Sequence, residues 1–239
     1  MTLLSTQITE GFPLWENIST NSRYGRYATE IEKRAILKGL THTAKPTTAL
    51  EIGCDGGRWT KLLSDLGWNI ICTDIDKQSL NICQKRVPTA TCVHVNPEDS
   101  RFPCDTDSIG LLLCIEVAPV INADWFFDEA SRVLQKGGWI VGVMWNRFSW
   151  RGWLYHHLPG LRVTGSGHWY WYPISYEAWR KRFCQKGYTI VYEEGYAWLP
   201  SRRTSNSHLI PFAANLEHFL GLRKLVSLSP MITFVAQKI

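Results

Sequence analysis

The sequence of 239 residues is 45% hydrophobic and 20% charged, a composition that excludes a disordered chain and suits one domain with insertions. Its formal net charge of +5 is spread along the chain without a long basic block, so we do not expect nucleic acid as a partner. The first residues lack the pattern of a signal peptide, in which a basic segment is followed by an apolar one. No apolar run reaches the ~20 residues that a membrane-spanning helix needs. We therefore expect a cytoplasmic protein without a membrane partner, either a monomer or a homodimer.

The seven cysteines are dispersed and form no C-x-x-C pair, which is typical of reduced thiols. Several lie within apolar runs, such as Cys72 and Cys114, where a thiol packs as a small hydrophobic group. The cysteine pattern therefore predicts core packing and no metal site.

Apolar periodicity predicts helices and strands that alternate along most of the chain. Strands are expected at 48–52, 68–73, 91–95, 109–115, 139–145, 188–192 and 231–236. Helices are expected at 29–40, 59–66, 76–86, 124–134, 175–186 and 211–220. The first five strands are apolar on both faces, which favours an α/β fold with a parallel sheet covered by helices on both sides.

Two parts of the chain depart from this alternation. Residues 1–45 are expected to form an N-terminal helical lid, ahead of a main domain at 46–239. Within the main domain, 146–172 has no clear period, and we interpret 146–172 and 200–226 as insertions that cap the substrate.

A glycine-rich turn follows the first predicted strand, where residues 49–59 read ALEIGCDGGRW. Glycines at a strand-to-helix turn let backbone N–H groups approach a ligand at the carboxyl edge of the sheet. Asp74 ends the second strand, 21 residues after Gly53, and an acid there can accept hydrogen bonds from a ribose diol. The order of these features predicts a nucleotide-type site.

Glu51, two residues before Gly53, helps to choose among nucleotide ligands. A carboxylate at this place would repel a pyrophosphate, but it can anchor an ammonium group directly or through water. The turn also departs from the G-x-G-x-x-G pattern of dinucleotide sites. These features together favour a nucleoside that carries an amino acid.

The same residues resemble the class I S-adenosylmethionine-dependent methyltransferases, especially the small type 11 group. Residues 50–59 nearly reproduce the group's LEIGCGxGRW opening, and the resemblance covers about 48–147 in order and at the expected spacing. It continues through Asp74, Asn96-Pro97-Glu98-Asp99, Phe102-Pro103, the residues 113–117 and 132–138, and Asn146-Arg147. The resemblance implies S-adenosylmethionine as cofactor, S-adenosylhomocysteine as product, and a Rossmann-like sheet of seven strands with the last one reversed.

The resemblance also implies roles for individual residues. The methionyl end of the cofactor would meet Glu51 and Gly53, the ribose would meet Asp74, and the adenine would meet the Glu98-Asp99 loop. The cofactor-binding set expected on this basis is Tyr27, Glu51, Gly53, Cys54, Asp55, Gly57, Asp74, Ile75, Glu98, Asp99 and Cys114. The sequence departs from the family pattern at Asp55, which replaces the middle glycine, and at Ala118-Pro119, where many members carry Glu-His.

Aromatic residues are concentrated after the fifth strand, and they point to the class of methyl acceptor. The residues expected to line an acceptor pocket are Trp145, Trp153, Trp169, Trp171 and Phe212. Such rings suit a flat, partly apolar acceptor and can hold a cationic amine. The alternative is that they only pack the insertion onto the sheet. Tyr24-Gly25-Arg26-Tyr27 could likewise close over the cofactor or simply begin a helix.

Methyl transfer is an in-line displacement, so positioning of the acceptor supplies much of the catalysis. A hydroxyl acceptor generally also needs a base, and the candidates are His156, His157 and Glu116, each of which could equally be a solvated or packed residue. The sequence therefore predicts transfer of a methyl group to an N or O atom of a small, partly aromatic metabolite. The alternatives are an RNA or protein methyltransferase of the same fold, or a non-catalytic S-adenosylmethionine-binding protein.

Overall fold

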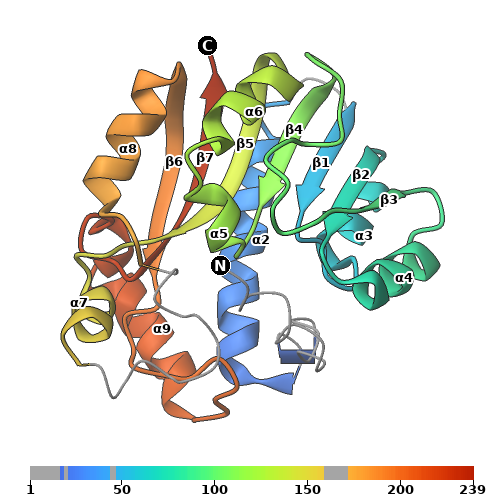
Figure 1. Ribbon diagram of the computed structural model, residues 1–239. Helices are drawn as coiled ribbons and strands as arrows, with labels where there is room; N and C mark the ends of the chain where they lie inside the picture. The colour runs from blue at the N-terminus through green and yellow to red at the C-terminus, as the bar shows by residue number, and fades with distance from the viewer. Residues whose placement is uncertain (1–16, 19–20, 44–46, 159–171) are drawn as a thin grey trace.

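The computed structural model describes residues 17–18, 21–43, 47–158 and 172–239. At its centre is a seven-stranded sheet with the strand order β3-β2-β1-β4-β5-β7-β6 (Figure 1). The strands are β1 (Thr48–Ile52), β2 (Asn69–Asp74), β3 (Thr91–His94), β4 (Ile109–Cys114), β5 (Leu134–Trp145), β6 (Tyr188–Tyr196) and β7 (Met231–Lys238). All neighbours from β3 to β5 are parallel, whereas β7 runs antiparallel to both β5 and β6. The predicted α/β fold with a reversed last strand is confirmed.

Helices cover both faces of the sheet, as the apolar strands require (Figure 1). One face carries α2 (Arg23–Leu40), α3 (Arg58–Asp65) and α4 (Lys77–Arg86), and the other carries α6 (Phe126–Val133) and α8 (Tyr176–Gln185). The short α5 (Ala118–Ile121) follows β4. Each face therefore has its own buried apolar cluster, and Cys54 of the glycine-rich turn belongs to the cluster on the face with α2 and α3.

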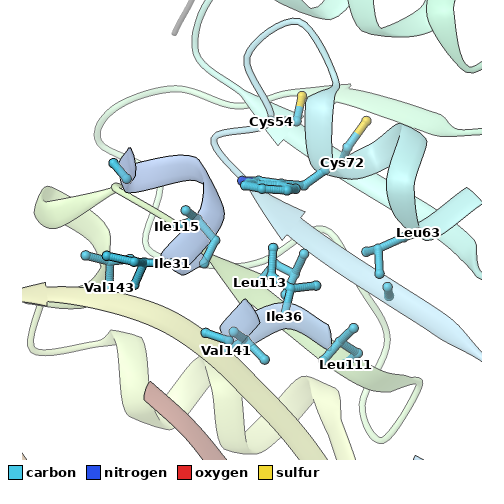
Figure 2. Close-up of a cluster of buried hydrophobic side chains, with 14 of the residues drawn as sticks. Ile31, Ile36, Cys54, Leu63, Cys72, Leu111, Leu113, Ile115, Val141 and Val143 are labelled. Atoms are coloured by element: carbon cyan, nitrogen blue, oxygen red, sulfur yellow. The ribbon is translucent and has the colours of Figure 1, made fainter. Parts of the chain in front are cut away.

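Helix α2 is longer than the periodicity predicted and belongs to the core. Its N-cap is Ser22, whose hydroxyl accepts the backbone N–H of Gly25 at 2.8 Å. Figure 2 shows Ile31 and Ile36 of α2 among the side chains of the central strands β4 and β5. Part of the expected lid is thus a helix packed on the sheet; residues 1–16, 19–20 and 44–46 lie outside the described residues.

The helices α7 (Trp150–His157) and α9 (Leu209–Phe219), which belong to the two insertions, lie at the end of the sheet toward which the parallel strands point (Figure 1). The first insertion contains α7, which the sequence did not predict because its aromatic residues give no helical period. Ser149 begins this helix by accepting the backbone N–H of Gly152 at 3.1 Å. The second insertion contains α9 and the 3-10 turn η3 (Leu222–Lys224). No helix within the described ranges combines the length and apolar character needed to cross a membrane.

Candidate cofactor and acceptor site

The glycine turn between β1 and α3 requires left-handed backbone at three positions. Gly53 has φ +67°, and an added Cβ there would lie 2.6 Å from the Val117 side chain. Gly57 has φ +81° at the N-cap of α3, and its Cβ would lie 2.6 Å from the Cys83 sulfur. Asp55 adopts φ +50°, a conformation that Asp tolerates better than most residues. The replacement of the middle glycine by Asp55 therefore leaves the turn intact.

Asp74, at the end of β2, is bound to this turn. Its Oδ2 accepts the backbone N–H of Asp55 and its Oδ1 accepts that of Asp76, both at 2.9 Å. Burial raises the pKa of Asp74, while these two backbone hydrogen bonds act in the opposite direction. The carboxylate is held at the carboxyl edge of the sheet, beside the half-exposed Ile75, where the sequence places the ribose.

Glu51 lies beneath the turn rather than at its surface. Its side chain is buried in β1 and accepts a hydrogen bond from the Thr60 hydroxyl of α3 at 2.5 Å. Burial raises its pKa to about 8. The carboxyl group is therefore joined to α3, and any contact with an ammonium group competes with Thr60.

Four cysteines surround the underside of the turn. The Cys72 sulfur lies 3.6 Å from that of Cys83 and 3.2 Å from that of Cys92, its register partner on β3. Within the described ranges, Cys54, Cys72 and Cys83 form the one group of potential metal ligands in mutual reach, and all three are buried. Contacts with the Cys72 and Cys83 thiols, together with burial, raise the pKa of Cys54, so this thiol stays neutral.

The remaining predicted cofactor residues differ in their placement. Glu98 and Asp99 lie on an exposed loop after β3, where the Asp99 carboxylate accepts the Asn96 backbone N–H at 2.7 Å. Cys114 is fully buried, and its thiol belongs to the apolar cluster on the face opposite the turn. A cofactor could therefore contact the main chain of Cys114 but not its thiol.

Tyr27 connects elements instead of facing open space. Its hydroxyl donates to the Glu217 carboxylate of α9 at 2.5 Å and accepts the Ala197 backbone N–H at 2.9 Å. The Tyr27 ring lies 6.3 Å from that of Tyr196, centroid to centroid. These contacts hold α2 against α9 and the end of β6. Because the Tyr27 hydroxyl is already bonded within the protein, a contact with the cofactor would have to come from the ring. That contact stays a prediction.

An ion pair between a buried carboxylate and a partly exposed guanidinium lies beyond the end of β4. Glu116 has φ +60° and a side chain only 9% exposed, and it pairs with the Arg203 guanidinium at 3.0 Å. Arg203 is held by the Ser22 hydroxyl, which donates to its carbonyl at 2.8 Å. The buried rings of Tyr24 and Tyr196 lie close enough for the Glu116 and Arg203 charges to act on their hydroxyl groups.

Sequence analysis did not find Arg203, Tyr24 and Tyr196 as a group. Arg203 and Tyr196 lie more than 170 residues from the start of α2, and no local pattern joins them to Glu116. One further residue could have been found: Glu32 lies on the apolar face of α2, and an acid at such a position is a signal for a buried role.

Glu32 contacts the residue that begins α3. Its Oε2 accepts the Arg58 Nη2 at 3.0 Å, and Arg58 also donates to the Thr29 hydroxyl at 2.6 Å. The Arg58 guanidinium lies 4.0 Å from the ring centroid of Trp59. Helix α2 is thereby fastened to the residue that follows Gly57.

The predicted base and acceptor residues of the first insertion are only partly brought to this region. The His156 Nε2 lies 3.2 Å from the Tyr172 carbonyl oxygen, whereas His157 is exposed and stacks on Trp153 at 4.8 Å between ring centroids. Trp153 is 55% exposed, and Trp145 is 1% exposed within the core. The position of Trp145 supports the alternative that this ring packs the insertion onto the sheet.

Phe212 and two tryptophans complete the acceptor set that the sequence predicts. Phe212 lies on α9 and is 66% exposed, on a face that also carries the exposed Leu209, Leu216 and Phe219. Trp169 and Trp171 lie outside the described residues. Their contribution to an acceptor pocket stays a prediction.

Two open grooves border the molecule. One, of about 470 Å³, follows the loop from Leu199 to Leu209 and so lies beside Arg203. The other, of about 560 Å³, is lined by residues that include Thr48 and Ser108, at the amino ends of β1 and β4. Because ligands of open α/β sheets bind at the carboxyl ends of the strands, the second groove is unrelated to the site.

Comparison with known proteins gives this geometry a context. Residues 50–142 match the family described as methyltransferase domain. No curated protein matches the sequence. A structure from Thermotoga maritima, an S-adenosylmethionine-dependent methyltransferase named as a possible histamine N-methyltransferase, is similar with a TM-score of 0.56 and 14% identity, covering 94% of this chain and 93% of its own.

Two further solved structures share the fold. A methyltransferase of Methanosarcina mazei has a TM-score of 0.58 and 15% identity over 84% of this chain and 96% of its own. The geranyl diphosphate C-methyltransferase of Streptomyces coelicolor, in complex with S-adenosylhomocysteine, has a TM-score of 0.57 and 15% identity over 87% of this chain and 76% of its own.

Proposed function

We propose that this chain, a class I S-adenosylmethionine-dependent methyltransferase, transfers the methyl group to an N or O atom of a small, partly aromatic metabolite. Two observations support the methyltransferase activity: the match of residues 50–142 to a methyltransferase domain, and the order of the seven strands in the sheet. The observation that carries the acceptor proposal is the Glu116–Arg203 ion pair, which lies beyond β4 next to the buried rings of Tyr24 and Tyr196.

The tyrosines around the ion pair suit a flat acceptor. Tyr24, Tyr27 and Tyr196 pack on one another, with centroid distances of 5.7 and 6.3 Å between successive rings. Burial raises the pKa of Tyr24 to about 12, and it raises the pKa of Tyr196 well above its usual value. Both hydroxyl groups are therefore neutral at neutral pH and can donate to or accept from an uncharged acceptor.

S-adenosylmethionine supplies a methyl group on a positively charged sulfur, and the protein orients the acceptor toward it. For an amine acceptor, the nitrogen attacks as the free base and its extra proton leaves after transfer. For a hydroxyl acceptor, Glu116 is the described carboxylate in place to take the proton, and Arg203 holds that carboxylate in position.

The basic runs of the sequence favour a small acceptor over RNA. Arg182 pairs with Asp124 at 3.0 Å, Arg180 approaches Glu193 at 4.0 Å, and Arg203 pairs with Glu116. Side chains that neutralise acids within the protein are poorly placed to bind phosphates. The similar structures named above include one described as a possible histamine N-methyltransferase and a C-methyltransferase, so an experiment has to identify the atom that this protein methylates.

The test uses S-adenosylmethionine with an isotopically labelled methyl group. Purified protein is incubated with separate pools of amines, phenols and other small metabolites, and with RNA and protein fractions, and labelled products are identified by mass spectrometry. We expect label in a small amine or phenol. Label that enters only RNA, only protein or only a carbon atom would contradict the acceptor proposal.

Glu116→Gln then separates the two acceptor types. With a hydroxyl acceptor we expect the variant to lower kcat by about 10²–10⁴-fold, the usual contribution of a positioned base. With an amine acceptor we expect a smaller effect, mainly on KM. Ile239→Ala, which alters an exposed side chain after β7 and outside both insertions, serves as a control with unchanged kinetics.

A further inference from the structure

Two buried polar atoms beside the glycine turn have no hydrogen-bond partner among the described residues. They are the second carboxyl oxygen of Glu32, Oε1, and the indole nitrogen of Trp59, Nε1. The Glu32 side chain is fully buried, and Trp59 is almost so. A buried polar atom left without a partner destabilises the folded protein, so such atoms usually meet a ligand or an ordered water.

The two atoms belong to one connected group. Arg58 joins them, because its guanidinium pairs with the other oxygen of Glu32 at 3.0 Å and lies 4.0 Å from the Trp59 ring centroid. Arg58 and Trp59 are the first two residues of α3, directly after Gly57. The unpartnered atoms are therefore tied to the segment where the sequence places the methionyl end of the cofactor.

The chemistry of the two atoms is complementary. When Glu32 is ionised, its oxygen accepts hydrogen bonds and donates none. The indole N–H of Trp59, in contrast, donates a hydrogen bond and accepts none. An ammonium group satisfies the first and a carboxylate satisfies the second. The positive charge of Arg58 and the N-terminus of α3 further favour a carboxylate close to Trp59.

Glu51, which the sequence assigned to the ammonium group, is less suited to this task in the structure. Its carboxyl group already receives the Thr60 hydroxyl, and it is not among the buried groups without a partner. Glu32 offers an oxygen that no other described residue uses.

We propose that Glu32 and Trp59 form the subsite for an α-amino-acid group, with Glu32 receiving the ammonium and Trp59 donating to the carboxylate. This inference rests on the proposed function, since it identifies the group as the methionyl end of the cofactor. Glu32 and Trp59 are thus cofactor-binding residues, and Arg58 is a positioning residue between them.

Two ligands test the subsite directly. S-adenosylhomocysteine carries the α-amino-acid group, whereas 5′-methylthioadenosine shares the adenosine and the thioether but lacks that group. Isothermal titration calorimetry measures both affinities without any turnover. We expect Glu32→Gln to weaken S-adenosylhomocysteine binding by about 10–100-fold, the range for a lost hydrogen bond to a charged group. The affinity for 5′-methylthioadenosine should stay within about twofold.

Trp59→Phe provides a second variant that keeps a ring for Arg58 to stack on. It removes the N–H together with the five-membered ring that carries it, a truncation that the control below shares, and we expect S-adenosylhomocysteine binding to weaken by about 3–10-fold with little change for 5′-methylthioadenosine. Trp179→Phe is the matched control, since Trp179 also has a buried, unpartnered indole N–H, but in the cluster on the opposite face of the sheet. It should leave both affinities unchanged. If Glu32→Gln fails to fold by circular dichroism, Trp59→Phe decides the outcome.

The outcomes separate this subsite from the proposed function. If the unaltered protein binds both ligands but the two variants lower both affinities equally, or neither, the subsite is wrong while cofactor binding stands. A Glu32→Gln variant with unchanged S-adenosylhomocysteine affinity and a raised KM for the acceptor would assign Glu32 to the acceptor instead. If the unaltered protein binds neither ligand, the proposed function is wrong as well.

Discussion

Asp74 holds the turn and keeps acceptor capacity that a ligand could use. Each carboxylate oxygen accepts one backbone N–H, from Asp55 or from Asp76, and each retains a second lone pair. We expect Asp74→Ala to weaken S-adenosylhomocysteine binding by about 1.5–3 kcal/mol, because the hydrogen bonds from the ribose to a charged group are lost. Calorimetric titration measures the change.

Asp76→Ala is the control for this substitution. Asp76 caps α4 by accepting the backbone N–H groups of Gln78 and Ser79. Its loss should lower the free energy of unfolding by about 1 kcal/mol and leave the affinity within about twofold. An unchanged affinity in Asp74→Ala would remove this residue from the ribose role.

The buried carboxyl of Glu51 makes stability depend on pH. Its pKa of about 8 in the folded protein lies above the ordinary value of 4.5, so the folded state holds the proton more tightly. The stabilisation is complete below pH 4.5 and is lost as the pH rises to about 8. Because glutamine does not titrate, the free energy of unfolding of Glu51→Gln relative to the unaltered protein should rise from pH 5 to pH 8.

Urea unfolding at pH 5, 6.5 and 8 measures this difference. The unaltered protein and the variant are compared at each pH, so that the titration of other groups, including the buried Glu32, cancels. A difference that stays constant across this range would show that Glu51 is ionised in the folded state.

At the scale of elements, Tyr27 fastens three of them. Tyr27→Phe removes the hydrogen bonds to Glu217 of α9 and to the Ala197 N–H at the end of β6. We expect the free energy of unfolding to fall by about 1–3 kcal/mol, because the buried Glu217 loses a donor. Chemical denaturation measures this change.

The same variant tests the cofactor role expected from the sequence. If Tyr27 acts only through its hydroxyl contacts between elements, S-adenosylhomocysteine affinity at a temperature where the variant is folded should not change. A large loss of affinity without a loss of stability would instead support direct contact with the cofactor.

Helix α7 carries an exposed ring that the sequence predicts to line the acceptor pocket. Trp153 is exposed and stacks on His157, so Trp153→Ala should change the free energy of unfolding by less than about 0.5 kcal/mol. If the ring lines the acceptor pocket, the KM of the acceptor rises while S-adenosylhomocysteine affinity is kept. Steady-state kinetics with the identified acceptor measure this. An unchanged KM would leave α7 without a role in acceptor binding.

At the scale of the whole molecule, α2 and the sheet share one core. Gly39 of α2 approaches β5 so closely that an added Cβ would lie 2.6 Å from a methyl group of Val141. Ile31, Ala35 and Ile36 are buried against the same strands. We therefore expect α2 and the sheet to unfold in a single transition, and Gly39→Val to lower the midpoint of that transition by overpacking.

Differential scanning calorimetry with hydrogen exchange of α2 amides checks this expectation. The amides of α2 should exchange with protection similar to that of β4 and β5. Separate, earlier unfolding of α2 would favour the division of the chain at residue 45 into a lid and a main domain.

Much of this molecule could be predicted because the signals are local. The strands β1 and β4 were predicted to within a residue, since short apolar runs bounded by turn residues specify buried strands. The glycine turn and Asp74 could be assigned because strand, turn, helix and acid follow one another within a single βαβ unit. Helix α7 was not predicted, because its aromatic residues lack a helical period.

The sequence by itself determined the α/β class and the match of residues 50–142 to a methyltransferase domain, since both depend on patterns that short stretches of chain carry. The reversed last strand was implied by the resemblance to the methyltransferases and is present in the sheet. Only the tertiary structure decided which side chains meet at the site. Glu32 and Arg58 are 26 residues apart, and Tyr27 and Glu217 are 190 apart. Such partners are chosen by the packing of α2 and of the second insertion against the sheet. Because a hydrogen bond between distant residues leaves no period in the sequence, the Glu116–Arg203 pair and the Glu32–Arg58–Trp59 group could be recognised only in the folded chain.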